Sequence, residues 1–286
     1  GSDYEQKIEL KSGITATLHD AGHILGSTIT EFDIGGKKIY FTGDLGNPPT
    51  PLLNPPYFPE DADFVVVESA YGNRIHEDRA NRKEILEDYI VETMNRGGVL
   101  MIPSFAMERT QELLFELNDL MEHKRIPHVP VFVDSPLAIN LTEVYRKYPG
   151  YFNKQATHII DSGDDVFNFP GLTFTRTSEE SKMINDVPAP KIIIAGSGMS
   201  IGGRILHHER RYLSDPKSAI LFMGYQVKNS LGRRILDGNK DVSIFGEKVP
   251  VNCRVKAIGG YSAHADQEMI LRWIASATLK ARLKKP

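Results

Sequence analysis

Cysteine is nearly absent from this chain of 286 residues, which contains only Cys253. A single cysteine rules out an internal disulfide framework and suits a reducing compartment, so we expect a cytoplasmic protein. Long apolar runs are also missing: none approaches the ~20 residues of a membrane-spanning helix, and we expect no membrane partner. Charge of one sign is not in excess either, since 34 Lys and Arg face 37 Asp and Glu. A nucleic-acid site must therefore be a local basic patch.

Two kinds of pattern are present. Residues 7–41 are β-like and include a hairpin with Gly35 and Gly36 at its turn, and the apolar run 64–69 predicts a strand covered on both faces. From residue 79 on, helical spacing alternates with apolar strands, which predicts a parallel α/β layer. The strands expected there are 99–105, 129–135, 172–177, 191–198 and 218–225, and the helices are 79–95, 111–123, 137–147 and 204–213. We read residues 148–171 as an irregular, acidic segment, and the tail as strand, glycine turn and helix.

Four polar residues share one arrangement, a strand-like stretch beside small residues. They are His23, Asp44, Glu68 and His264. Side chains at strand ends are held in fixed mutual geometry by the sheet, and two histidines with two carboxylates have the composition of a hydrolytic metal site. Each also has an ordinary interpretation: Asp44 as a turn former, Glu68 as a solvated strand end, and His264 as part of a helix start capped by Asp266.

The order of these motifs carries a family resemblance. DAGHILGS, YFTGDLG, VVVESAYG and GGYSAHAD, together with PSFAMERTQELL, VFVDSPLA and IIIAGSGMSIGGRILHH, resemble the β-CASP branch of the metallo-β-lactamase fold. The resemblance covers nearly the whole chain and is greatest to bacterial and archaeal RNA-processing nucleases. It implies an α/β fold in which a partial metallo-β-lactamase sandwich (3–72 and 246–286) carries an inserted parallel β-CASP domain (73–245).

The resemblance also implies roles for single residues. His23 and Asp44 match metal ligands, and the complete enzyme would hold two zinc ions that activate water for attack on a phosphodiester. His264 would contact the scissile phosphate or protonate the leaving oxygen, and Glu68 would orient it, since a neighbouring carboxylate favours the imidazolium form. Ser262, in the same motif as His264, is assigned to phosphate binding. The implied substrate is RNA, more readily single-stranded, with DNA and a homo-oligomer left open.

A glycine loop and a basic helix are further candidates for phosphate contact. Gly196, Ser197 and Gly198 follow a strand and precede a helix, where backbone N–H groups can bind an anion, and Arg204 begins a run of basic residues. The spacing departs from a dinucleotide fingerprint because Ile201 stands where the third glycine belongs. A tight strand-to-helix turn and a solvated charged face are the structural alternatives.

One expected motif is absent. No two of the nine histidines have the His-x-His spacing of the family's main metal motif. We read Gly1–Ser2 as a tag remnant and the chain as a nuclease trimmed at both ends, and we expect this polypeptide alone to be a poor nuclease, because two ligands hold a zinc pair weakly. The alternatives are a non-catalytic nucleic-acid-binding or scaffolding member of the family, and a nucleotide-binding α/β domain that uses the Gly196–Gly203 loop.

Overall fold

The chain forms two compact units. The structure is a computed structural model and describes residues 2–76 and 81–277. Unit 1 contains the described residues up to His76, the segment Gly150–Ala156, and the residues from Ser262 on. Unit 2 contains residues 81–149 and 157–261. None of the described helices is long and apolar enough to cross a membrane.

Unit 1 is built on a five-stranded sheet in the order β1-β2-β3-β4-β5, antiparallel except for the parallel pair β4 and β5. The expected hairpin is confirmed, with Gly35 and Gly36 at positive φ between its strands. The last helix, α8 (Gln267–Ala277), shares a hydrophobic core with the sheet and contributes the fully buried Trp273. The strands are β1 (Lys7–Lys11), β2 (Ile14–Asp20), β3 (Thr28–Ile34), β4 (Lys37–Phe41) and β5 (Phe64–Val66).

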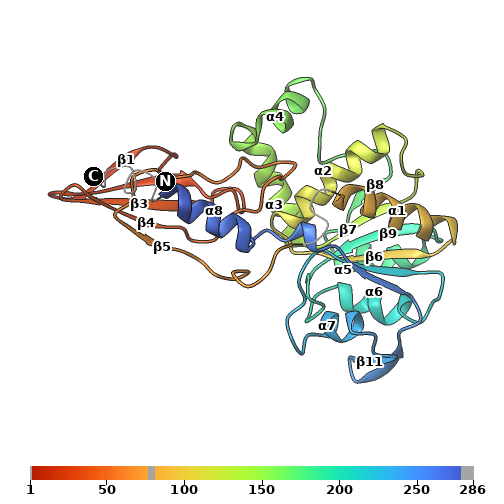
Figure 1. Ribbon diagram of the computed structural model, residues 1–286. Helices are drawn as coiled ribbons and strands as arrows, with labels where there is room; N and C mark the ends of the chain where they lie inside the picture. Colours follow the sequence, from red (N-terminus) through yellow and green to blue (C-terminus); the bar gives the residue numbers. More distant parts are fainter. Residues whose placement is uncertain (1, 77–80, 278–286) are drawn as a thin grey trace. The chain divides into compact units, whose positions relative to one another are not determined.

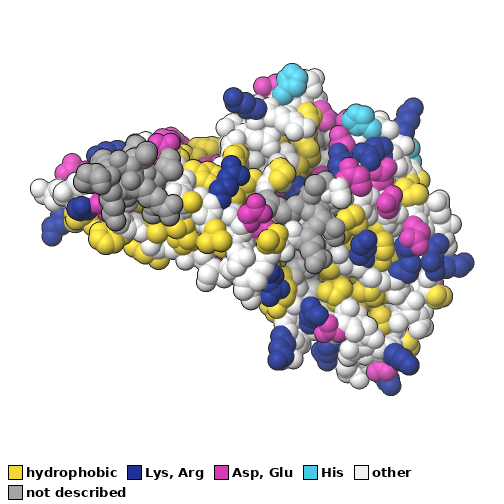
Figure 2. All heavy atoms as spheres, in the orientation of Figure 1, with side chains coloured by type: hydrophobic (Ala, Val, Ile, Leu, Met, Phe, Trp, Pro, Cys, Tyr) yellow, Lys and Arg dark blue, Asp and Glu magenta, His cyan; other side chains and the backbone are white. Residues whose placement is uncertain are grey.

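The apolar run 64–69 behaves differently from its prediction. Only Phe64–Val66 form a strand, and Phe64 and Val66 are 62% and 52% exposed. In the described part of the chain β5 pairs with β4 alone, so it is an edge strand whose alternate side chains face away from the core. The expectation of a strand covered on both faces was therefore wrong. Figure 2 shows hydrophobic side chains over the region that Figure 1 labels β4 and β5.

Unit 2 contains the predicted parallel layer, a six-stranded sheet in the order β13-β10-β6-β9-β7-β8 with every neighbouring pair parallel. Strands β6, β7, β9 and β10 are buried throughout, as their apolar runs predict. Figure 1 shows α6 and α7 on one side of this sheet and α2 and α3 on the other. The strands are β6 (Val99–Pro103), β7 (Val131–Asp134), β8 (Leu172–Phe174), β9 (Lys191–Ala195), β10 (Ala219–Phe222) and β13 (Arg254–Ala257), and a separate hairpin is formed by β11 (Asp241–Ile244) and β12 (Glu247–Pro250).

The helices between these strands follow the expected alternation. They are α1 (Arg82–Asn95), α2 (Arg109–Glu122), α3 (Pro136–Lys147), α4 (Lys154–Asp161), α5 (Ser178–Met183), α6 (Ile205–Tyr212) and α7 (Leu231–Leu236), with 3-10 turns at Pro149–Tyr151, Ile184–Asp186 and Gly259–Tyr261. The α/β prediction is confirmed. Positions 79 and 80 of the first expected helix lie outside the described residues. The expectation of an irregular segment at 148–171 was wrong for α4, which begins where the Asn153 side chain accepts the Ala156 N–H.

The point where the chain returns to unit 1 also differs from the expected one. We placed it at about residue 246, but β13 pairs in parallel with β10 over its whole length, from Arg254 to Ala257. Residues up to Tyr261 therefore belong to unit 2, and the return falls at Ser262. A local sequence pattern shows that residues 254–257 form a strand but not which sheet they join.

Candidate metal centre

Three of the predicted site residues come together in unit 1. His23, Asp44 and His264 each place a ligand atom within 4.8 Å of the others. Nε2 of His23 lies 3.9 Å from Oδ2 of Asp44, and the two imidazole rings have centroids 4.6 Å apart. The side chain of Asp44 is 60% exposed, whereas that of His23 is 11% exposed, so the cluster is open to solvent on the carboxylate side.

The loops that carry these residues are joined through the backbone. His23 lies in the loop after β2 and Asp44 in the loop after β4. The N–H of Gly46 donates to the carbonyl of Ala21 at 2.7 Å. A Cβ at Gly46 would lie 1.9 Å from the carbonyl oxygen of Gly22, so only glycine permits this approach. The small residues that flank His23 and Asp44 in the sequence therefore bring the two ligand loops into contact.

Glu68 ties the Asp44 loop to His264. It follows β5, its side chain is 8% exposed, and its Oε1 accepts the N–H of Leu45. Its Oε2 lies 3.1 Å from Nδ1 of His264. A buried carboxylate with one oxygen on each loop fixes their separation. The orienting role that the family resemblance implies for Glu68 stays a prediction.

Both histidines are held through the same ring nitrogen. Nδ1 of His23 lies 3.2 Å from the carbonyl oxygen of Ala263, and Nδ1 of His264 faces Glu68. A carbonyl oxygen only accepts, so Nδ1 of His23 carries hydrogen and the lone pair is on Nε2. Metal-binding histidines in proteins are held in this way, with the second nitrogen donating to a carbonyl or carboxylate.

The backbone of His264 is fixed from two sides. Nε2 of His76 donates to the carbonyl of His264 at 3.0 Å, and the N–H of Ala265 donates to the carbonyl of Leu45 at 2.9 Å. Gly46 and His264 form an antiparallel bridge. His76 was not among the predicted site residues, because an isolated histidine with no motif around it gives no local signal.

A second titratable group lies close to the His23 loop. Asp20, the last residue of β2, accepts the N–H of Gly22 at 2.8 Å. Its burial raises the pKa of this carboxyl group to about 6, against the smaller opposing effect of that hydrogen bond. The His23 loop is thus closed by a carboxyl group that titrates near neutral pH.

The donor set fits a zinc ion. Nitrogen and oxygen ligands lie about 2.0–2.2 Å from zinc, so two ligands of one ion are at most about 4 Å apart. In a tetrahedral site the two ligand atoms would be about 3.5 Å apart. The 3.9 Å between His23 and Asp44 is close to this value, and all three ligand atoms of the cluster lie within 4.8 Å of one another. Catalytic zinc sites use three protein ligands and keep one position open.

His19 serves a different purpose from His23. The residue is 3% exposed, and its ring stacks on that of Tyr57 with the centroids 3.9 Å apart. Its Nδ1 faces Glu5 and its Nε2 faces Glu31. Both ring nitrogens thus have carboxylate partners, and His19 is outside the cluster.

The predicted phosphate-binding residues lie in varied surroundings. In unit 2 the Gly196–Gly203 loop is closed on itself, because the N–H of Ser197 donates to Gly202 and that of Ile205 to Gly196. The Ser197 hydroxyl accepts the N–H of Ile201 at 3.1 Å. These bonds favour the tight-turn interpretation. A cavity of about 520 Å³ nevertheless has Gly196, Ser197, Gly198 and Arg204 among its lining. In unit 1 Ser262 is buried, and its carbonyl accepts from Asn47.

Two sequence profiles match the chain in the regions just described. The Beta-Casp domain matches residues 110–235, and the Zn-dependent metallo-hydrolase RNA specificity domain matches residues 248–281. The chain belongs to the β-CASP family. The resemblance read from the motifs is thereby confirmed, together with its metallo-β-lactamase-type α/β fold.

Several known proteins align with almost the whole chain. Ribonuclease TTHA0252 from Thermus thermophilus is 38% identical, over 95% of this chain and 62% of that protein. The RNase J-like protein of Methanocaldococcus jannaschii is 31% identical, over 95% and 63%. Transcription termination factor FttA of Thermococcus kodakarensis is 34% identical, over 96% and 44%. The chain thus spans less than two thirds of each of these relatives.

A solved structure shares the fold. A protein of unknown function from Enterococcus faecalis V583 superposes with a TM-score of 0.50 at 10% identity, over 97% of this chain and 59% of the other. At this identity the likeness concerns the fold alone.

Proposed function

We propose that this β-CASP protein takes part in metal-dependent hydrolysis of RNA phosphodiester bonds at the cluster of His23, Asp44 and His264. The cluster itself is the observation that carries the proposal: residues from three separate loops converge with ligand atoms within 4.8 Å. If Asp44 were only a turn former and His264 only part of a helix start, nothing would bring them together with His23. The names of the ribonuclease relatives and of the RNA specificity domain support RNA as the polymer.

In this proposal His23 and Asp44 hold the metal. His23 offers Nε2 because the carbonyl of Ala263 holds the hydrogen of Nδ1. Asp44 offers a carboxylate on the solvent side, where a phosphodiester can approach. A bound zinc ion supplies Lewis acidity toward phosphoryl oxygens and activates water near neutral pH.

His264 and Glu68 act on the leaving oxygen. As imidazolium, His264 keeps the hydrogen of Nδ1 on Glu68 and donates the hydrogen of Nε2 to the oxygen that departs from phosphorus. Glu68 is a positioning residue, since its other oxygen is held by the N–H of Leu45. A second role for His264, as a third metal ligand, is favoured by its place in the cluster.

Metal binding and cleavage are measured separately to test these roles. Zinc affinity is obtained by competition with a chromophoric chelator, and cleavage with a 5′-labelled single-stranded RNA. Asp44→Asn and His23→Ala are expected to weaken zinc binding at least tenfold and to abolish cleavage. Glu68→Gln is expected to lower cleavage about 10- to 100-fold, the usual cost of losing a partner of an essential histidine. His123→Ala, which removes an exposed histidine of unit 2, is the control.

His264→Ala decides between the two roles of His264. Unchanged zinc affinity with lost cleavage identifies a proton donor, whereas lost zinc affinity identifies a ligand. If Asp44→Asn and His23→Ala bind zinc as well as the control does, the proposed centre is wrong. RNA binding without any metal-dependent cleavage would instead favour a non-catalytic member of the family.

We further propose that the polypeptide of 286 residues is a weak nuclease on its own. The described cluster offers three donors, and one of them, Asp44, is mostly exposed. Two-metal hydrolases place two ions about 3.5–4 Å apart, which needs more ligands than these. Fast zinc-dependent cleavage by the purified polypeptide would contradict this point and leave the location of the centre intact.

A further inference from the structure

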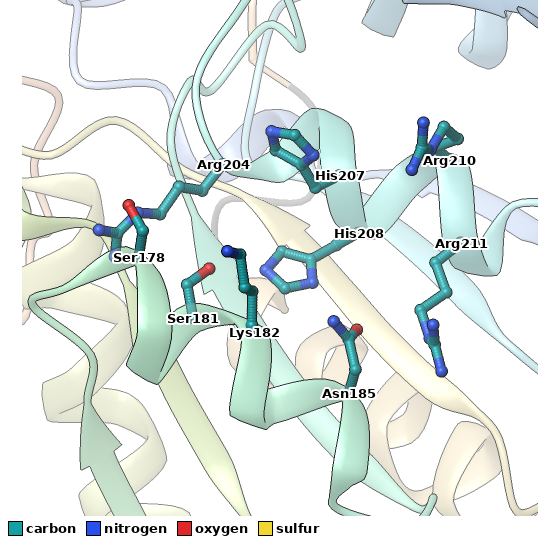
Figure 3. Close-up of a pocket in the computed structure, with 9 residues that line it drawn as sticks. All are labelled: Ser178, Ser181, Lys182, Asn185, Arg204, His207, His208, Arg210 and Arg211. Carbon is teal, nitrogen blue, oxygen red and sulfur yellow. The ribbon is translucent and has the colours of Figure 1, made fainter.

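Unit 2 contains a basic pocket that the proposed metal chemistry does not use. Its volume is about 690 Å³, and its lining includes Lys182, Arg204, His207, His208, Arg210 and Arg211. Figure 3 shows these side chains with two serines and an asparagine. Among the described residues that line the pocket there is no aspartate or glutamate.

The pocket is built on a buried anchor. Asp134, at the end of β7, is fully buried and accepts Nη1 of Arg204 at 2.8 Å, Nε2 of His208 at 2.7 Å and the hydroxyl of Ser181 at 2.7 Å. Ser181 belongs to α5, His208 to α6, and Arg204 precedes α6. One carboxylate therefore fixes both walls of the pocket, so its shape does not depend on flexible surface side chains.

Asp134 offsets the charge of Arg204, but the positive charges of Lys182, Arg210 and Arg211 are not cancelled in this way. Within residues 2–76 and 81–277, no carboxylate is paired with Lys182 or Arg211. Arg210 has an ion pair with Glu247 at 3.3 Å, but both side chains are largely exposed, and such pairs are weak. Glu209, also on α6, is buried, and burial raises its pKa to about 8, so it is mostly uncharged at neutral pH.

The cations are spread along the pocket. Arg204 and Arg211 are seven residues apart, which corresponds to about 10 Å along a helix axis. In Figure 3 Arg204 and Ser178 lie at one end and Arg210 and Arg211 at the other. A single phosphate group needs donors that converge on one point, whereas a row of cations suits a chain of phosphates.

An exposed aromatic ring adjoins this row. Phe245, at the turn between β11 and β12, is 52% exposed, and its ring centroid lies 4.7 Å from that of His207. The guanidinium of Arg210 lies 5.7 Å from the same ring. Proteins that bind single-stranded nucleic acid combine a basic track with aromatic side chains on which bases stack.

We propose that this pocket binds single-stranded RNA, with backbone phosphates against Lys182 and Arg211 and a base stacked on Phe245. The choice of RNA as the polymer rests on the proposed function. The location of the contact rests on the pocket alone.

The test is RNA binding in the absence of metal. A fluorescent single strand of about 12 nucleotides, close to the length such tracks cover, is titrated with the full chain in EDTA, where zinc-dependent cleavage cannot occur. At about 0.1 M salt the double variant Lys182→Glu/Arg211→Glu is expected to bind at least tenfold more weakly than the unaltered chain, and to reduce the slope of log affinity against log salt by about 1. Lys217→Glu/Lys240→Glu makes the same charge change at exposed positions of unit 2 outside the pocket and is expected to keep most of the affinity.

The aromatic contact has its own variant. Phe245→Ala is expected to weaken binding about fivefold and to leave the salt slope unchanged, because stacking releases no counterions. Lys182→Ala and Arg211→Ala, which preserve the fold more readily, are expected to show smaller losses in the same direction.

Several results would overturn the inference. Equal affinities of the two double variants would place the RNA elsewhere. Absence of any RNA binding in EDTA would show that the pocket does not bind RNA. Full displacement of the oligonucleotide by millimolar AMP or pyrophosphate would make the pocket a site for small phosphorylated molecules. If the pocket variants bind RNA normally while metal-dependent cleavage is intact, the proposed function stands and the pocket inference is wrong. If RNA binds through the pocket but is not cleaved, the pocket inference stands and the proposed function is wrong.

Discussion

Replacing Asp134 by Asn is expected to destabilise unit 2 strongly, because this carboxylate is fully buried and accepts hydrogen bonds from several side chains. Besides Arg204, His208 and Ser181, its carboxylate accepts the hydroxyl of Thr175 at 2.6 Å. The hydrogen bonds from these groups outweigh the cost of burial and hold the pKa of Asp134 at about 2, below its ordinary 3.8.

The magnitude follows from this pKa. The difference between 3.8 and about 2 corresponds to about 2 kcal/mol of stability in favour of the ionised form. Asn also leaves Arg204 and His208 without their anion, and breaking a buried ion pair costs about 3–5 kcal/mol. Because the folded pKa of Asp134 is depressed, its contribution is fully present above pH 4, falls by about half at pH 3 and is lost below about pH 2.

Urea unfolding measures this contribution. At pH 7 Asp134→Asn is expected to lower the free energy of unfolding by about 2–5 kcal/mol. The control, Asp165→Asn, removes an exposed partner of Arg146 and should cost at most about 1 kcal/mol. The reasoning is refuted if the two variants unfold at the same urea concentration. It is also refuted if the cost of Asp134→Asn is the same at pH 3 as at pH 7.

Two further changes probe buried features of the two units. Gly46→Ala must push the backbone away from Gly22, so we expect at least tenfold weaker zinc binding and a lower Tm. Gly150→Ala is the control, since its Cβ meets open space and should change neither quantity. Equal zinc affinities of the two variants would contradict the close approach of Gly46 to Gly22. The pKa of Glu209 is raised to about 8, so its protonated form supports the folded state fully below about pH 4.5. As the pH rises to 8 the free energy of unfolding falls by about 4 kcal/mol from this group, and Glu209→Gln should abolish that pH dependence. Urea midpoints at pH 5, 6.5 and 8 show this as a flatter profile for the variant, and parallel profiles would count against it.

The sequence predicted the elements that depend on local patterns. Buried parallel strands appear as continuous apolar runs, and β6 and β9 lie within the expected ranges 99–105 and 191–198. The ligand candidates were found for the same reason, since Asp44 and His264 follow or precede regular elements at positions flanked by small residues. The small residues proved informative because Gly22 and Gly46 lie in direct backbone contact.

Features that depend on pairing across the chain could not be read from the sequence. The run at 64–69 is apolar throughout, yet β5 is an edge strand, because what covers a strand is set by its neighbours. The residues that hold the site have the same limitation. The carbonyl of Ala263 and the side chain of His76 fix His23 and His264, but a carbonyl exists at every residue and His76 belongs to no motif.

The net charge of the chain illustrates the difference between composition and arrangement. At −3 overall, the protein has no general attraction for a polyanion. Charges are screened beyond about 8–10 Å at physiological salt, so a nucleic acid responds to the local set of side chains. In the basic pocket that set is four Lys and Arg with no acid in the described lining. Asp134 is buried behind the pocket, where its charge offsets that of Arg204 and its hydrogen bonds to Arg204, His208 and Ser181 fix the pocket walls. The basic surface of this acidic chain thus comes from Lys182, Arg210 and Arg211, which the fold brings together, and no count of charges along the sequence could have shown it.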